Sequence, residues 1–236
     1  MLGALGWGVL AASSLLLGTV LALLRKQWPD GLVGGVLAFG AGALISSVAF
    51  ELAEEGLDLG GPVPVAVGIA LGALAFYLAD RAVERIGGRQ GGGSAGLPLA
   101  LGSLLDGIPE QAVLGIGLAA GQGVSVALLV AVFVSNLPES IGSTTEMRAA
   151  GRSPGAILRL WAVVTVVCAL ATVGGYALAD VVGGSVKAGI DGFAAGALLV
   201  MLVDEMVPEA AAKAGDRAGL ATVLGFAVAA GLSTLS

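Results

Sequence analysis

Long apolar runs separated by short polar segments dominate the pattern of this chain. A run of about 17–25 apolar residues is long enough to cross the hydrocarbon core of a bilayer as a helix. Eight such runs follow one another with short connections, which predicts an all-α integral membrane protein with a single domain over residues 1–236. The predicted spans are 3–24, 31–50, 62–80, 97–120, 124–146, 156–179, 187–206 and 217–235.

Composition supports a membrane protein and excludes several classes of function. Of the 236 residues, 57% are hydrophobic and 12% are charged, whereas soluble domains carry about 25% charged residues. The chain has one cysteine, no histidine, no nucleophile elbow and no phosphate-binding loop, so we expect neither enzymatic activity nor a prosthetic group. We expect a lipid bilayer around the protein and no nucleic-acid partner, and the small-residue faces that 40 glycines provide would permit a homodimer.

The basic residues predict the orientation in the membrane. If the N-terminus lies outside, ten of the eleven lysines and arginines fall at the inner ends of spans, and Lys187 lies outside. The positive-inside rule then places both termini outside a multi-pass protein of the inner or plasma membrane. The same orientation puts Glu51, Glu54, Glu55 and Asp58 at the outer surface, either as a solvated rim or as a funnel that concentrates cations.

The second and seventh predicted spans resemble each other in sequence. Residues 39–44 are Phe-Gly-Ala-Gly-Ala-Leu and residues 193–198 are Phe-Ala-Ala-Gly-Ala-Leu. At the same offset, Glu51 aligns with Glu205 and Glu55 with Glu209. These spans run in opposite directions in the predicted topology, which indicates an inverted repeat of the kind found in many secondary transporters. The eight helices then divide in a 3+2+3 arrangement with the fourth and fifth in the middle.

Each of the two central spans carries a carboxylate beside a helix-breaking proline. The motifs are Leu-Asp-Gly-Ile-Pro-Glu at 105–110 and Ser-Asn-Leu-Pro-Glu-Ser at 135–140. A proline inside a helix frees the carbonyl four residues earlier, and in lipid such a group needs protein, water or an ion as a partner. The i, i+4 spacing puts Asp106 and Glu110 on one helix face, and antiparallel packing brings Glu139 to a similar depth.

These oxygen donors predict a cation site between the fourth and fifth helices. Neither span contains a lysine or arginine that could neutralise the acids. An ionisable residue at this depth costs about 2.5–3.5 kcal/mol on insertion scales, so the cluster needs a cation, protons or both. Acids that are protonated and hydrogen-bonded to neighbouring helices are the structural alternative. The predicted metal ligands are Asp106, Glu110, Ser135, Asn136 and Glu139, with Ser46, Ser47, Ser143 and Glu146 as candidates along the pathway.

A third acidic motif, Asp-Glu-Met-Val-Pro-Glu at 204–209, lies at the inner end of the seventh span. We interpret it as a solvated helix end, with a role in metal release as the weaker alternative.

The whole pattern resembles the ZIP (Zrt/Irt-like) family of divalent metal transporters, especially its short prokaryotic members. The resemblance covers the eight spans, the outer termini, the central pair of motif helices and the flanking repeats. It implies that the family's metal site, built from the fourth and fifth helices, is present here with changed ligands. Asp106 stands at the first motif histidine, Gly107 at the asparagine, Glu110 at the glutamate and Ser135 at the second motif histidine, while Asn136, Pro138 and Glu139 match directly.

The resemblance implies transport of a divalent cation into the cytoplasm by movement of one helix group against another. Both motif histidines are absent, and an oxygen-only donor set suits Mn²⁺, Mg²⁺ or Ca²⁺ better than an imidazole site does. Carboxylates also bind Zn²⁺ and Fe²⁺, so we expect Zn²⁺, Mn²⁺ or Fe²⁺ at a single metal position, with proton coupling and downhill flux both open. Two alternatives stay open: a metal-sensing or scaffolding membrane protein without transport, and a transporter of another small solute.

Overall fold

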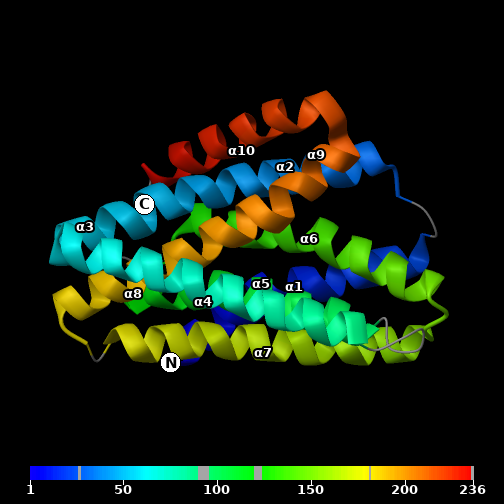
Figure 1. The fold of residues 1–236 in the computed structure, drawn as a ribbon, viewed down its shortest axis with the longest axis horizontal. Coiled ribbons are helices and arrows are strands. Elements are labelled where there is room, and N and C mark those ends of the chain that lie inside the picture. The colour runs from blue at the N-terminus through cyan, green and yellow to red at the C-terminus, as the bar shows by residue number, and fades with distance from the viewer. Residues whose placement is uncertain (26–27, 90–95, 120–123, 181, 235–236) are drawn as a thin grey trace.

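The computed structural model describes residues 1–25, 28–89, 96–119, 124–180 and 182–234 (Figure 1). These described residues form helices and contain no strand. The elements are α1 (Leu2–Leu24), α2 (Asp30–Ser47), the π-helix η1 (Val48–Glu54), α3 (Glu55–Gly60), α4 (Pro62–Arg89), α5 (Gly96–Ala119), α6 (Val126–Ala149), α7 (Pro154–Asp180), α8 (Gly184–Met201), the π-helix η2 (Leu202–Met206), α9 (Val207–Ala214), the 3₁₀-helix η3 (Gly215–Arg217) and α10 (Ala218–Ser233).

The helices are those of a membrane protein, but the predicted count of eight spans is not confirmed. Six stretches of the described chain are long and apolar enough to cross a membrane: Leu2–Leu24, Asp30–Gly60, Pro62–Val83, Val126–Ala149, Pro154–Ala179 and Gly184–Ser233. The last stretch contains the predicted spans 187–206 and 217–235 and turns back at Gly215, whose φ is 59° (Figure 1). Helix α5 is not among the six, and its centre carries Asp106, Pro109, Glu110 and Gln111.

The long helices pack as two groups of four, which corrects the predicted 3+2+3 arrangement. In the first group, α7 lies along α5 and α1, and α6 lies along α1. In the second group, α4 lies along α8 and α10 along α2, with α3 and α9 packed beside them. The prediction was wrong because it followed chain order, whereas packing pairs helices of opposite halves: α1 with α7, α2 with α10 and α4 with α8. The groups meet where α6 contacts α2 and where α5 contacts α4 and α8.

Glycines set the close approach of helices within each group. A Cβ at Gly42 of α2 would overlap the backbone carbonyl of Thr222 in α10. Between α5 and α7, a Cβ at Gly115 would overlap the carbonyl of Thr172. Small residues let helix backbones touch, which is the main source of packing in lipid because apolar side chains gain little there.

The sequence repeat is reproduced in the local backbone structure. Helix α2 and helix α8 each change to a π-helix, at Val48 and Leu202, and each unit ends at a glycine with positive φ, at Gly61 and Gly215. These pairs have the same sequence spacing as Glu51 and Glu205. The two units run in opposite directions (Figure 1), as the predicted inverted repeat requires. Each π-helix contains one of the two aligned glutamates, and π-helices occur frequently at functional sites.

Candidate functional site

A small cavity of about 40 Å³ lies where the two helix groups meet. Its volume is enough for an ion or a water molecule, since about one probe sphere of space suffices for a water. Carboxyl groups dominate the wall, which is formed by Leu37, Asp106, Glu110, Ser135, Glu139, Met201, Glu205, Met206 and Glu209. Four of the five predicted metal ligands are therefore among the residues that line one cavity.

The two Pro-Glu motifs position their side chains without breaking their helices. Both α5 and α6 continue through their prolines, Pro109 and Pro138. Glu110 is 2% exposed, and its Oε1 accepts a hydrogen bond of 3.2 Å from the Ser135 hydroxyl. Its Oε2 is buried with no hydrogen-bond partner among the described residues. This oxygen is free to bind a ligand that enters the cavity.

Glu205 joins the site from the third acidic motif. The side chains of Asp106 and Glu205 share a hydrogen bond, which links α5 to η2. Two carboxyl groups can share such a bond only when one of them carries a proton, so protonation of this pair would compete with a cation for the same place. The interpretation of residues 204–209 as a solvated helix end was therefore wrong for Glu205, which is partly buried at the cavity. The signal that could have found it is its alignment with Glu51.

Glu209 lines the same cavity and forms an ion pair with Lys213, one turn along α9. The pair lies against α6, because a Cβ at Gly142 would be 3.4 Å from Lys213 Nζ and 3.7 Å from Glu209 Oε1. The two predicted central spans contain no basic residue. Lys213 of α9 nevertheless places an ammonium group next to Glu209, one of the carboxylates that line the cavity.

The carboxyl groups surround the cavity without converging on one point. Across the described part of the chain, no three Asp, Glu or Cys side chains lie close enough together to hold a metal ion. Metal binding would require these side chains to turn inward together. The arrangement is a set of acids in one polar cavity rather than a preformed coordination sphere.

The remaining predicted site residues do not line this cavity. Asn136 is fully buried, and neither its amide nitrogen nor its oxygen has a hydrogen-bond partner among the described residues. Ser46 and Ser47 are buried in α2, whereas on α6 Ser143 is half-buried and Glu146 is exposed.

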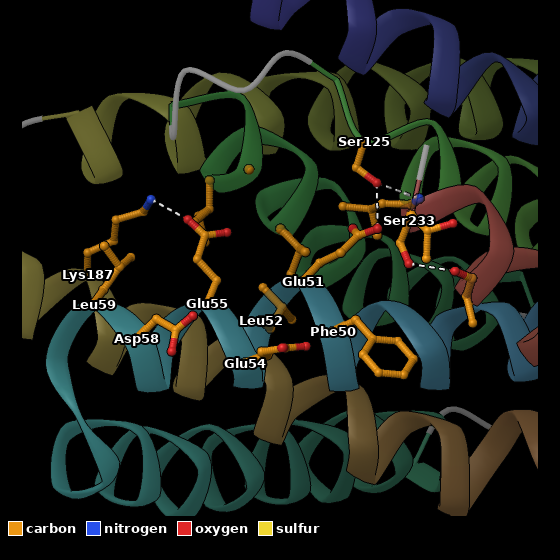
Figure 2. A pocket seen from close by; sticks show the side chains of 16 residues that line it. Phe50, Glu51, Leu52, Glu54, Glu55, Asp58, Leu59, Ser125, Lys187 and Ser233 are labelled. Atoms are coloured by element: carbon orange, nitrogen blue, oxygen red, sulfur yellow. Dashed lines mark hydrogen bonds and ion pairs between the residues drawn. The ribbon is translucent and has the colours of Figure 1, made fainter. Parts of the chain in front are cut away.

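A larger cavity of about 730 Å³ opens at the α3 end of the molecule (Figure 2). Glu51 and Glu55 point into it from neighbouring turns: Ser125 donates a 2.5 Å hydrogen bond to Glu51, and Lys187 lies 2.8 Å from Glu55. The predicted acidic cluster of Glu51, Glu54, Glu55 and Asp58 thus surrounds a hollow.

The two cavities share no lining residue among those described. On α5, Val113 lines the large cavity and lies three residues beyond Glu110, which lines the small one. Three residues of helix correspond to about 5 Å, so roughly one turn of α5 separates the cavities along its axis.

Sequence comparison finds a relative that is named as a transporter. No family model matches the chain. A protein of Arabidopsis thaliana that is named as a proposed zinc transporter is 29% identical over 222 residues, which cover 90% of this chain. The chain spans about a third of that relative, since the match covers 35% of the relative's length.

Proposed function

We propose that this protein carries a divalent metal cation across a membrane and that the small cavity is the binding position on its path. The observation that carries the proposal is that carboxyl groups from both helix groups line one cavity, with Glu110 fully buried there. Acids inside a membrane protein are expensive and mark ion pathways or proton relays. The similarity to a proposed zinc transporter supports metal as the cargo.

The main ligands in this proposal are Asp106, Glu110 and Glu139, with Ser135 as a further oxygen donor and Asn136 as a residue that turns toward the metal. Glu205 is added because it already shares a hydrogen bond with Asp106. Such an oxygen set binds Zn²⁺, Mn²⁺ or Fe²⁺ without histidine. The resemblance to ZIP transporters and the zinc in the relative's name make Zn²⁺ the first metal to test.

In this proposal eight helices cross the bilayer: α1, α2 with α3, α4, α5, α6, α7, α8 with α9, and α10. Both termini lie outside an inner or plasma membrane, and the basic ends of the helices face the cytoplasm. The large cavity then faces outward, and its acids raise the local cation concentration. The cation passes from there to the small cavity and into the cytoplasm.

The test is metal influx into proteoliposomes for Zn²⁺, Mn²⁺, Fe²⁺, Cd²⁺, Mg²⁺ and Ca²⁺, with wild type compared with Glu139→Ala. Influx of at least one metal that is lost in Glu139→Ala is the expected result. Asp216→Asn is the matched control, because Asp216 is an exposed acid in η3 outside both cavities. Folded wild-type protein that moves none of these metals would overturn the proposal and favour a sensor or a transporter of another solute.

A further inference from the structure

Asp191 of α8 is a buried acid without a hydrogen-bond partner. Its side chain is 1% exposed, and neither carboxylate oxygen has a hydrogen-bond partner among the described residues. It is not among the residues that line either cavity. A buried carboxylate without a partner is strongly destabilising, so its presence in a native protein requires an explanation.

An ion pair between Lys187 of α8 and Glu55 of α3 lies beside this acid. The Lys187 Nζ atom is 2.8 Å from Glu55 Oε1, and the two side chains are 12% and 27% exposed. Asp191 lies one turn along α8 from Lys187, at the i, i+4 spacing that lets side chains meet on a helix surface. It also faces α3, because a Cβ at Gly56 would be 3.5 Å from the Asp191 Cβ. The charges of both Glu55 and Lys187 act on Asp191, so one ammonium group is close to two carboxylates.

Glu55 and Glu51 both face the large cavity (Figure 2). Glu51 Oε1 accepts a hydrogen bond from Ser125, whereas its Oε2 is buried without a hydrogen-bond partner among the described residues. The carboxylate of Glu55 is occupied by Lys187, which donates a hydrogen bond to it. Removal of the ammonium would therefore leave two carboxylates, on neighbouring turns and facing one cavity, available to a cation.

We propose that the Lys187 ammonium is the internal occupant of a cation-capture site formed by Glu51 and Glu55. An entering divalent cation displaces the ammonium, which then pairs with Asp191. The inference rests on the proposed function, because it describes how the cation path selects its ion at the entrance. A lysine suits this exchange, since it carries a point charge and three donors on a flexible stem. The unpartnered carboxylate of Asp191 is then the second position of the ammonium.

The exchange leaves each charge with a partner. If Asp191 were absent, displacement from Glu55 would leave a mostly buried ammonium unpaired, which is costly. Lys187 also lies near the N-terminus of α8, where the helix dipole disfavours a positive charge. A shift toward Asp191 moves the ammonium away from that end of the helix. The ammonium is thus held at Glu55 but can be displaced.

The internal ammonium makes the site selective for divalent cations. Because Lys187 is tethered to the site, its ammonium competes for Glu55 without having to bind from solution. A monovalent ion carries the same charge as the ammonium and gains no Coulomb energy by replacing it. A divalent ion is attracted about twice as strongly at the same distance. Lys187 is therefore a specificity-determining residue that excludes Na⁺ and K⁺.

Mn²⁺ binding tests this role without requiring transport. Bound Mn²⁺ is counted by electron paramagnetic resonance in the purified full-length chain with Glu139→Ala, which removes a proposed ligand of the small cavity. Adding Lys187→Met should tighten Mn²⁺ binding about tenfold, at the low end of measured couplings between close opposite charges. Na⁺ at constant ionic strength should compete in Lys187→Met but not with Lys187 present, and Lys187→Arg, which keeps the charge, should stay insensitive to Na⁺. Unchanged Mn²⁺ affinity in Lys187→Met, or no competition by Na⁺ in that variant, overturns the inference.

Two further variants locate the Mn²⁺ that Lys187 controls. Glu51→Gln should abolish the binding that Lys187→Met tightens, because it removes one of the two ligands. Glu54→Gln removes an exposed acid of the same cavity and should change the affinity far less, since it takes away a charge without taking away a ligand. Equal losses in the two variants would show general attraction by the acidic cavity and would overturn the capture site.

Asp191→Asn tests whether the displaced ammonium moves to Asp191. The change should weaken Mn²⁺ binding when Lys187 is present, because the ammonium then loses its second partner. In Lys187→Met there is no ammonium to receive, so the same change should have a much smaller effect. Equal weakening in both backgrounds would show that Asp191 acts as an ordinary negative charge and would overturn the exchange. The expected binding pattern in a wild-type protein that moves no metal would instead refute the proposed function and leave the capture site standing.

Discussion

Glu205 and Asp106 share a hydrogen bond although they lie on different helix groups and 99 residues apart in the chain. The bond joins η2 to α5 across the boundary where the small cavity lies. Two carboxyl groups can share this bond only through a proton, so a cation that binds between them would take the place of that proton. In the proposed function, the same contact closes the interface and would offer the metal its first ligands.

Replacing Glu205 by Gln should weaken metal binding by about tenfold or more, because it removes a carboxylate from the cavity wall. Asp106→Asn should have a similar effect, and the double variant should lose less than the product of the two effects, because each single change already breaks the shared bond. Calorimetric titration of purified protein with Zn²⁺ measures all three. Fully multiplicative losses would show that the two carboxyl groups act independently.

Metal binding should release protons and should therefore strengthen as the pH rises. The cation replaces the proton held between Asp106 and Glu205, so the proton-bound form competes with metal at low pH. For one released proton the apparent affinity should rise by up to about tenfold per pH unit until the pair is deprotonated. Titration in buffers of different ionisation enthalpy gives the number of protons directly. In Glu205→Gln the pH dependence should be smaller, and an unchanged slope would refute the pairing.

The sequence predicted the helical class and the close placement of the polar side chains of α5 and α6, because local patterns carry this information. Apolar length predicts a span, and i, i+4 spacing predicts that Asp106 and Glu110 share a face. Asp106, Glu110, Ser135 and Glu139 indeed line one cavity.

Other features depend on packing between distant segments. Glu205 lies at the end of an apolar helix, and only the position of η2 against α5 distinguishes it from a solvated acid. Asn136 belongs to the motif in the sequence, but this position does not determine which way its side chain turns, and it does not line the cavity. The pairing of α2 with α10 likewise depends on glycine contacts that chain order does not predict.

Gly42→Ala should destabilise the protein by about 1–3 kcal/mol, which is typical of added methyl groups in packed interiors. The new Cβ would overlap the Thr222 carbonyl of α10, a backbone atom that cannot move without shifting the helix. Gly35→Ala is a matched control in the same helix, because nothing lies within 4 Å of a Cβ there. Thermal unfolding in detergent should show a lower midpoint for Gly42→Ala alone. Equal midpoints for the two variants would contradict the close packing of α2 on α10.

Lys213→Met should increase the affinity of the small cavity for metal by a few-fold, as expected for the loss of one partly exposed ion pair of about 0.2–1 kcal/mol. Lys213 pairs with Glu209, which lines the cavity, so its ammonium group competes with a cation for that carboxylate. Arg217→Met is the control: it removes a nearby positive charge at an exposed position outside the cavity. Zn²⁺ titration distinguishes direct competition from a general field effect. Tighter binding in Lys213→Met alone supports competition at Glu209, whereas equal gains in both variants would assign the effect to net charge.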